Sequence, residues 1–193
     1  MEGVPAWIRR LILLSNRRPF LQSVGNQRLR LPTLSHRAAL EQTAGRINGR
    51  FSDADWTPIR YLNRDYPHST LMGLMRAATV CVVTALQDGM NLVAKEFVGA
   101  QDPQNPGVLV LSNRTGSAHE LSDALIVNPY DLSGVAQAIW QALTMPLAER
   151  RDRNTRLLAK LKKERYPPLA SWFRWSVAGN DAMRLRSAAP NEL

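Results

Sequence analysis

The 193-residue sequence contains one cysteine, Cys81, so it can form no internal disulfide. Its apolar runs fall well short of the roughly 20 residues that a membrane-spanning helix needs. Arg9 and Arg10 interrupt the apolar stretch near the N-terminus, which makes it a poor signal peptide. Zinc-ligand spacings, a G-x-G-x-x-G fingerprint and internal repeats are also absent. We therefore expect a cytoplasmic protein without a membrane segment, a metal site or a bound cofactor.

Basic charge is plentiful but unevenly distributed. The sequence has 25 Lys and Arg against 16 Asp and Glu, a formal net charge of +9. Residues 1–37 contain seven basic and one acidic residue, residues 146–193 eleven and five, and residues 38–145 seven and ten. Because the excess lies at the two ends, and no helix-turn-helix or RNP-like pattern is present, we expect no nucleic-acid partner. The basic ends could instead face a partner domain or an anionic sugar phosphate.

Alternating segments predict an α/β protein with a doubly wound, Rossmann-like parallel sheet. Three apolar runs, at 79–84, 107–111 and 124–129, are typical of buried strands, and residues 56–62 are expected to form another. The expected helices lie at 35–47, after Ser69, at 91–100, after Ser117, and at 132–145, 146–165 and 169–178. In such a sheet, ligands bind beyond the carboxyl ends of the strands.

Residues 88–96, Asp-Gly-Met-Asn-Leu-Val-Ala-Lys-Glu, follow one of these strands and open a helix. The first N–H groups of a helix have no intrahelical partner and carry partial positive charge, so the segment can bind an anion. The carboxylates of Asp88 and Glu96 and the amide of Asn91 could take hydroxyl groups, and the set suits a sugar nucleotide. Taken alone, the same letters are explained more simply by a turn, an N-cap and a solvated glutamate.

A resemblance changes that balance. From Ala44 to Met145 the sequence resembles the C-terminal domain of the trehalose-6-phosphate synthases, glycosyltransferase family 20, which are retaining enzymes of the two-domain GT-B architecture. The resembling segments are AGRINGR at 44–50, WTP at 56–58, YLN at 61–63, residues 88–96, DP at 102–103, NPGVLVLS at 105–112, ALIVNPYD at 124–131, ALTM at 142–145 and LAER at 147–150. The family transfers glucose from UDP-glucose to glucose 6-phosphate. The resemblance therefore implies a glucosyltransferase with UDP-glucose as donor substrate.

The resemblance also implies roles for individual residues. Asp88 would bind hydroxyls of the donor glucose and is the catalytic candidate. The turn from Gly89 to Asn91 would line the sugar, backbone N–H groups of Leu92 and Val93 would hold the diphosphate, and Glu96 would bind the ribose. Tyr66 aligns with a position whose backbone meets the uracil. The candidate UDP-glucose-binding residues are Tyr66, Asp88, Gly89, Met90, Asn91, Leu92, Val93, Ala94, Lys95 and Glu96.

The departures from the family concern the acceptor side. Family members carry the glucose 6-phosphate site and a glycine-rich loop in an N-terminal domain that has no counterpart here, and the Arg-Leu-Asp-Tyr-x-Lys-Gly motif is missing. Arg28 is the one candidate for the acceptor phosphate, although its flanking residues do not match. Ala85 and Gln87 replace a usual Pro and Arg beside Asp88. We therefore expect a truncated enzyme that is inactive alone and binds glucose 6-phosphate only if an acceptor domain is supplied.

Within residues 112–121, the family pattern Ser-x-x-Ala-Gly-Ala-Ala-x-Glu-Leu is matched by Gly116 and Glu120, whereas Thr115 and Ser117 depart from it. His119 falls at a variable position, and the other histidines, His36 and His68, are expected at the surface.

We divide the chain into an irregular segment at 1–34, a Rossmann-like nucleotide-sugar-binding domain at 35–165, and a C-terminal helix and tail at 166–193. Within the first segment, Phe20-Leu21-Gln22 resembles a remnant of a family strand. An exposed apolar face is expected where the missing domain would pack.

Two further interpretations stay open. The chain could be a non-catalytic UDP-glucose-binding or regulatory module that pairs with a partner chain or with its own copy, or it could be a gene remnant.

Overall fold

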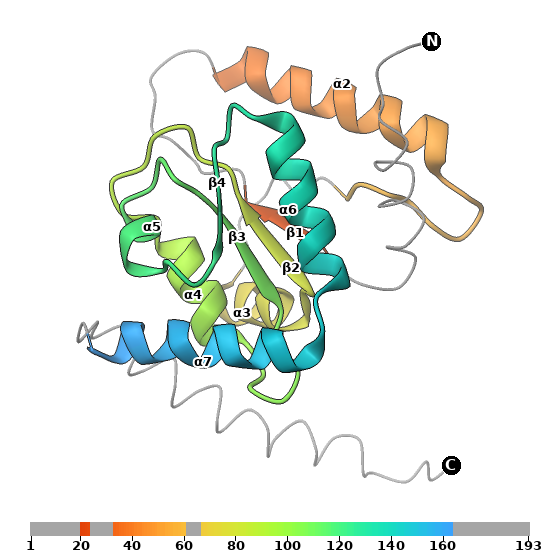
Figure 1. Ribbon diagram of the computed structural model, residues 1–193. Helices are drawn as coiled ribbons and strands as arrows, with labels where there is room; N and C mark the ends of the chain where they lie inside the picture. The colour runs from red at the N-terminus through yellow and green to blue at the C-terminus, as the bar shows by residue number, and fades with distance from the viewer. Residues whose placement is uncertain (1–19, 24–32, 61–66, 164–193) are drawn as a thin grey trace, which may run out of the picture.

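The computed structural model describes residues 20–23, 33–60 and 67–163. A parallel sheet lies at the centre of this part of the chain, with helices on both of its faces (Figure 1). The described strands are adjacent in the order β1-β2-β3-β4, and every neighbouring pair is parallel. The expected α/β class with a parallel sheet is thereby confirmed.

The strands are β1 (Phe20–Ser23), β2 (Val80–Val83), β3 (Val108–Ser112) and β4 (Leu125–Val127). Every residue of β2 and β3 is buried. Parallel strands covered by helices on both faces are expected to be continuously apolar, which is why these segments could be predicted from their composition. Val80 lies opposite Phe20 on one side and Val108 on the other, which fixes the register of the sheet.

The helices are α2 (Thr33–Phe51), α3 (His68–Ala77), α4 (Leu92–Ala100), α5 (Ser117–Glu120), α6 (Leu132–Thr144) and α7 (Leu147–Lys163). They agree with the expected helices within a few residues, except that α2 begins earlier and ends later than predicted. The expected helix at 169–178 lies outside the described residues. None of the helices in the described ranges combines the length and the apolar character that crossing a bilayer requires.

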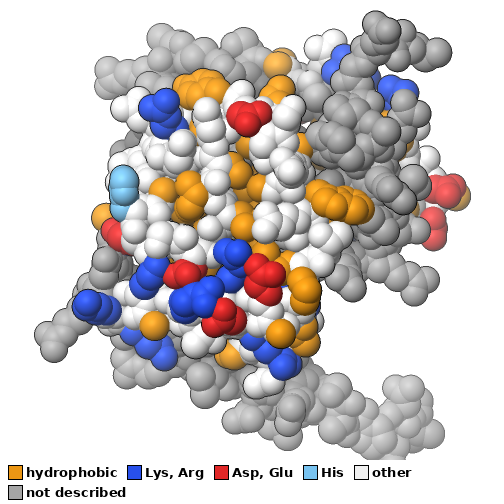
Figure 2. Space-filling view, in the orientation of Figure 1, with side chains coloured by type: hydrophobic (Ala, Val, Ile, Leu, Met, Phe, Trp, Pro, Cys, Tyr) orange, Lys and Arg blue, Asp and Glu red, His pale blue; other side chains and the backbone are white. Residues whose placement is uncertain are grey.

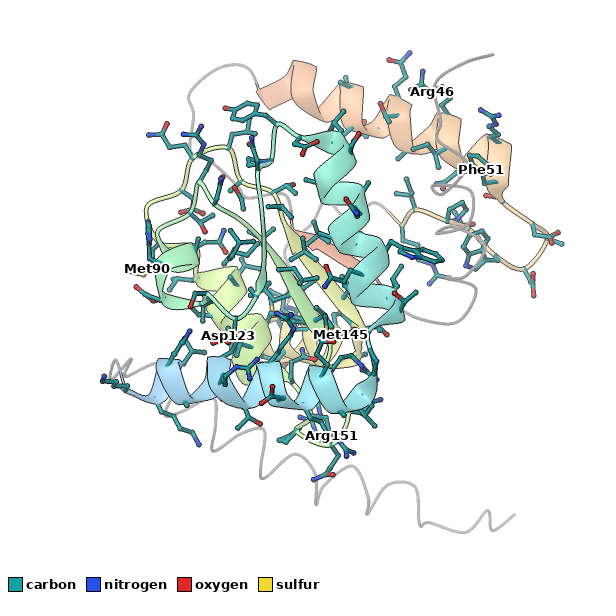
Figure 3. The ribbon with its side chains drawn as sticks, viewed as in Figure 1. Arg46, Phe51, Met90, Asp123, Met145 and Arg151 are labelled. Carbon is teal, nitrogen blue, oxygen red and sulfur yellow. The ribbon has the colours of Figure 1, made fainter. Side chains whose placement is uncertain are left out.

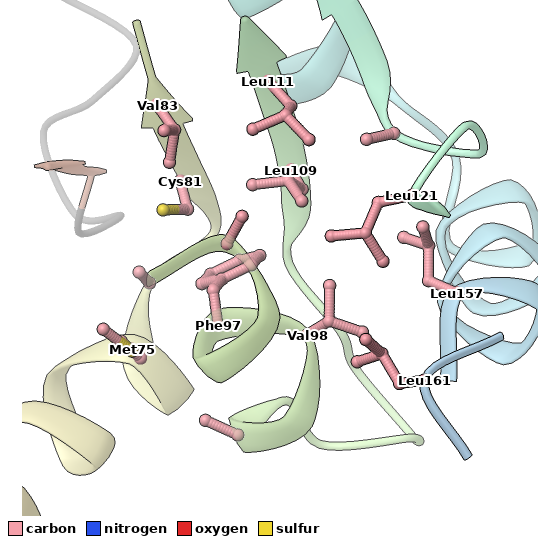
Figure 4. Close-up of a cluster of buried hydrophobic side chains, with 14 of the residues drawn as sticks. Met75, Cys81, Val83, Phe97, Val98, Leu109, Leu111, Leu121, Leu157 and Leu161 are labelled. Atoms are coloured by element: carbon pink, nitrogen blue, oxygen red, sulfur yellow. The ribbon is translucent and has the colours of Figure 1, made fainter. Parts of the chain in front are cut away.

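Side chains alternate along the strands between two cores. On one face, Cys81, Val83, Leu109 and Leu111 pack against α3, α4 and α7, and Phe97 of α4 lies in the middle of this cluster (Figure 4). On the other face, residues such as Val82 and Val110 pack against α6. Burial raises the pKa of the Cys81 thiol to about 12, so this cysteine is an inert part of the core.

Charged side chains fasten α7 to the rest of the domain. They gather along this helix in Figure 2, and Figure 3 shows Asp123 just above it. The Asp123 carboxylate pairs with Lys160 at 2.6 Å and with Arg156 at 2.6 Å. These partners lower the pKa of Asp123, chiefly through the hydrogen bond from Lys160, because they favour its charged form. The charge on α7 therefore attaches this helix to the loop before β4.

One prediction from the sequence was right only in part, and another was wrong. Residues 1–34 were expected to be irregular apart from a remnant of a family strand at 20–22, and Phe20–Ser23 does form β1, which pairs with β2 over four residues. Residues 57–60 were expected to lie in a strand, but they form none, and Trp56 makes only an isolated bridge to Asp53. The side chain of Asn48 instead accepts a hydrogen bond from the Ile59 amide at 2.9 Å and donates one to the Ile59 carbonyl at 2.8 Å. Residues 61–62 lie outside the described ranges.

Candidate functional site

The segment from Asp88 to Glu96, here called the donor segment, lies where the sequence placed it. It follows the carboxyl end of β2, and its second half forms the beginning of α4. This is the edge of a parallel sheet at which ligands bind in α/β folds. Met90 lies at the outer edge of the molecule in Figure 3 and is 43% exposed. The turn between strand and helix is therefore accessible from solvent.

The Asp88 carboxylate holds this turn together. Its Oδ1 accepts hydrogen bonds from the backbone amides of Met90 and Asn91, each at 3.2 Å, and its Oδ2 accepts one from the Asn91 side-chain amide at 2.9 Å. A carboxylate has about four acceptor positions. Three protein donors thus leave room for about one further donor, such as a ligand hydroxyl, on a side chain that is only half-buried.

The position of Asn91 at the start of α4 determines which of the first helix amides stay open, that is, without a hydrogen-bond acceptor among the described residues. Its φ of 64° is left-handed, a conformation that asparagine tolerates better than most residues. Its Oδ1 caps α4 by accepting a hydrogen bond from the Ala94 amide at 2.9 Å. The Asn91 and Ala94 amides are thus both taken by side chains. The amides of Leu92 and Val93 have no acceptor among the described residues, and they lie at the positive end of the helix dipole.

The loop after β3 braces this turn from behind. Residues 113–117 are here called the bracing segment. The Gly116 amide donates a hydrogen bond to the Asp88 carbonyl at 3.0 Å, and the Ser117 amide donates one to the Met90 carbonyl at 3.1 Å. The Ser117 hydroxyl donates to the Asn91 carbonyl at 3.1 Å. Gly116 is required here because a Cβ would lie 2.0 Å from the Gly89 carbonyl oxygen.

Ala94 and Lys95 differ from the other predicted ligand residues. Both side chains are fully buried, and the Lys95 ammonium forms an ion pair with the Glu120 carboxylate of α5 inside the protein. A side chain with no exposed surface cannot reach a ligand in the turn. Their side chains support the donor segment from the interior, so a contact of either residue with UDP-glucose would come from its backbone and stays a prediction.

Glu96 lies one helical turn after Leu92 and therefore on the same face of α4. It is half-buried, and burial raises the pKa of its carboxyl group, while the nearby charge of His68 lowers it. Leu92 is 49% exposed, so this face of the helix is open near its N-terminus. The half-buried Glu96 side chain thus lies on the same face of α4 as the exposed Leu92 side chain.

The remaining predicted residues fall in three groups. Tyr66 and Arg28 lie outside the described residues. His68 is exposed, as expected, His119 is exposed as well, and His36 lies in α2. Among the described residues, no group of three or more His, Cys, Asp or Glu side chains gathers as metal ligands would. The supporting roles of Ser117 and Glu120 were not predicted, although residue 120 was already noted as part of a matched pattern.

Comparison with known proteins gives these features a context. A model of glycosyltransferase family 20 matches residues 15–176. The trehalose-6-phosphate synthase of Salmonella arizonae is 58% identical over 127 residues, which are 66% of this chain and 27% of that protein. This chain thus spans about a quarter of the length of the curated relatives it matches.

Two solved structures are also similar. The trehalose-6-phosphate protein of E. coli bound with UDP-2-fluoro glucose has a TM-score of 0.72 and 41% identity, over 90% of this chain and 39% of that one. An α,α-trehalose-phosphate synthase (UDP-forming) of Burkholderia xenovorans in complex with glucose-6-phosphate has a TM-score of 0.67 and 50% identity, over 78% of this chain and 32% of that one. The expected relation of the fold to the GT-B trehalose-phosphate synthases is confirmed.

Proposed function

The chain belongs to glycosyltransferase family 20, and we propose that it supplies the donor half of an α,α-trehalose-phosphate synthase. In that reaction, glucose passes from UDP-glucose to glucose 6-phosphate with retention, and UDP leaves. UDP-glucose is the ligand of the donor segment in this proposal, and the structural neighbour bound with UDP-2-fluoro glucose supports that choice.

One observation carries the proposal. At the start of α4, side chains accept hydrogen bonds from the Asn91 and Ala94 amides. The two amides between them, of Leu92 and Val93, have no acceptor among the described residues. Two adjacent amides at a helix N-terminus suit a diphosphate. As the bond between glucose and UDP breaks, negative charge grows on the phosphate oxygen. Donors that are already fixed in place stabilise that charge without having to reorganise.

The side chains of the donor segment complete this assignment. Asp88 offers its remaining acceptor position to a glucose hydroxyl while its other positions hold the turn. Gly89, Met90 and Asn91 line the sugar. Glu96 accepts hydrogen bonds from the ribose hydroxyls, which a carboxylate does better than a neutral amide. Tyr66 meets the uracil through its backbone.

The acceptor side needs more than the described residues. We propose that glucose 6-phosphate, the ligand of the Burkholderia xenovorans structure, binds only when an acceptor domain faces the donor segment. That domain would come from a partner chain, and Arg28 is the candidate for the phosphate. Holding both substrates in one cleft supplies on the order of 7–11 kcal/mol of barrier lowering. A cytoplasmic location remains part of the same proposal.

Titration calorimetry with UDP-glucose tests the donor assignment. The 193-residue chain is expected to bind UDP-glucose, and Glu96→Gln is expected to weaken binding about tenfold, since hydrogen bonds to a charged group contribute about 1.5–3 kcal/mol. Glu149→Gln on α7 is the matched control, with unchanged affinity. A folded chain that binds neither UDP-glucose nor UDP would refute the proposal.

A non-catalytic donor-binding module is the second candidate, and one observation favours it. The turn, its cap and its brace are all formed within the described residues. Incubation with UDP-glucose and glucose 6-phosphate distinguishes the two functions. Trehalose 6-phosphate formed by the purified chain would establish catalysis, whereas donor binding without product would support the module.

A further inference from the structure

We propose that Ser117 is a positioning residue that orients the Leu92 amide for the diphosphate of the donor. This inference rests on the proposed function, because it assigns a specific device to the same site. Ser117 is the first residue of α5 and is fully buried, and its hydroxyl donates to the Asn91 carbonyl at 3.1 Å.

The physical link is the planarity of the peptide bond. The Asn91 carbonyl and the Leu92 amide belong to one peptide unit, whose six atoms lie close to a plane. In the trans form, the carbonyl and the N–H point to opposite sides of that unit. A hydrogen bond that fixes the Asn91 carbonyl therefore also fixes the direction of the Leu92 N–H, one of the two open amides of the site.

This peptide unit has a particular need for such a restraint. It follows Asn91, whose left-handed φ of 64° is a conformation that non-glycine residues seldom adopt. The Asn91 side chain is already used on both ends, since its Nδ2 donates to Asp88 and its Oδ1 accepts from Ala94. The Ser117 hydroxyl approaches the same residue from a segment 26 positions away in the sequence. The restraint thus comes from outside the turn itself.

The rest of α5 keeps Ser117 in place. The Ser117 amide donates to the Met90 carbonyl at 3.1 Å, so the residue holds two successive peptide units of the turn. At the other end of this short helix, Glu120 pairs with the buried Lys95 of α4. The two ends of α5 therefore contact the turn and the helix of the donor segment, which limits movement of Ser117 relative to both.

The variant Ser117→Ala removes the hydroxyl and keeps the backbone bond to Met90. It is expected to fold, because no volume is added and the backbone bond to Met90 is kept. We expect the affinity for UDP to fall roughly three- to tenfold, the equivalent of one hydrogen bond. The affinity for uridine, which has no phosphate, is expected to stay within twofold. A general structural role would change both affinities alike.

Thr115→Ala is the matched control. Its hydroxyl is also buried in the bracing segment, but it donates to the carbonyl of Ser112 at the end of β3, at 3.0 Å, and not to the donor segment. This variant is expected to leave the affinities for UDP and uridine unchanged. An equal loss in both variants, or no loss of UDP affinity in Ser117→Ala, would overturn the proposal.

A second measurement separates this inference from the proposed function. The amide resonance of Leu92 in a ¹⁵N NMR spectrum of the ligand-free chain is expected to shift or broaden in Ser117→Ala and to stay in place in Thr115→Ala. A Leu92 resonance that is unchanged in Ser117→Ala contradicts the orienting role. If the wild-type chain binds no UDP while this resonance responds, the orientation holds and the proposed function fails.

Discussion

At the scale of single residues, Asp88 and Asn91 do two things with one set of atoms. Hydrogen bonds between these two residues shape a turn that begins a helix. Their side-chain oxygens also accept hydrogen bonds from the Asn91 and Ala94 amides, which are then unavailable to a ligand. Because the Asn91 and Ala94 amides are bound in this way, the amides between them, those of Leu92 and Val93, are the ones left for a ligand. A sequence-based interpretation of Asp88 as only a sugar ligand misses this, because most of its acceptor positions already belong to the turn.

Gly116 gives a prediction at this scale. A Cβ at this position would approach the Gly89 carbonyl oxygen to 2.0 Å, so Gly116→Ala must displace the donor turn or the bracing segment. We expect a loss of about 1–3 kcal/mol in the free energy of unfolding, as for other overpacked sites, together with weaker UDP-glucose binding. Urea denaturation and calorimetry measure the two effects.

The control is Gly73→Ala in α3, where a Cβ would meet nothing within 4 Å. Because alanine has a higher helix propensity than glycine, the free energy of unfolding of this variant should increase by about 0.5–1 kcal/mol. If both variants changed stability by the same amount and in the same direction, the close approach of Gly116 to Gly89 would have no energetic importance.

Glu96 gives a pH prediction. Burial raises the pKa of its carboxyl group above the value in the unfolded chain. The folded state therefore holds this proton more tightly, and the contribution to stability is present below the unfolded pKa and is lost as pH rises through the folded one. We expect the free energy of unfolding of Glu96→Gln, relative to wild type, to increase over this window. A flat difference between pH 4 and pH 7, measured by urea denaturation, would contradict the raised pKa.

At the scale of elements, sequence patterns predicted the strands whose formation depends on their own residues. The strands β2 and β3 could be identified because continuous apolar runs suit a sheet covered on both faces. The shorter β4 is also a continuous apolar run, although Ile126 is 40% exposed. In contrast, β1 has only four residues and depends on pairing with a strand some 60 positions later, as Phe20 lies opposite Val80. Over its described residues, 56–60, the expected strand did not form because Asn48, eleven residues before Ile59, takes backbone groups that a ladder would use.

The candidate site divides in the same way. The donor segment could be predicted because it is contiguous, and a strand, turn and helix start follow one another in the sequence. The bracing segment could not, because its contacts join residues far apart in the chain, such as Ser117 and Asn91. Burial of Lys95 was equally hidden, since a lysine beside a glutamate on a helix is typical of a solvated surface.

The ion pair between α4 and α5 gives the prediction at this scale. Glu120→Ala would leave the buried ammonium of Lys95 without its carboxylate, and removing one partner of a buried pair costs about 3–5 kcal/mol. We expect about 2 kcal/mol here, because the Glu120 side chain keeps 31% of its surface exposed. Thermal and urea unfolding provide the measurement.

The double variant Lys95→Met with Glu120→Leu is the informative control. It removes both charges and is expected to recover most of the lost stability, since apolar replacements of buried pairs are often neutral or stabilising. A double variant as unstable as Glu120→Ala would show that packing around these residues, and not the uncompensated charge, causes the loss.

At the scale of the whole molecule, large apolar side chains are exposed at the carboxyl edge of the sheet. Leu86 follows β2 and is 53% exposed, and Tyr130 and Leu132 follow β4 with 64% and 80% exposed. Met90 and Leu92 of the donor segment add to the set. Clustered exposed apolar groups mark surfaces that bind other molecules. The expectation that an acceptor domain covers this edge remains a prediction, and self-association is its simplest consequence in the purified chain.

Substitutions at this edge test that consequence. Replacing Leu86 and Leu132 together by Gln should shift the chain toward the monomer in sedimentation velocity, because it removes apolar surface that association would bury. The unfolding midpoint should hardly change, since exposed substitutions usually alter stability by less than about 0.5 kcal/mol. Leu147→Gln is the control, because Leu147 is 37% exposed at the start of α7, and Arg150 of the same helix contacts Pro106 before β3, at the opposite edge. Equal effects of the control and the double variant would show that general surface hydrophobicity drives association. Loss of association confined to the double variant would identify the carboxyl edge of the sheet as the contact surface.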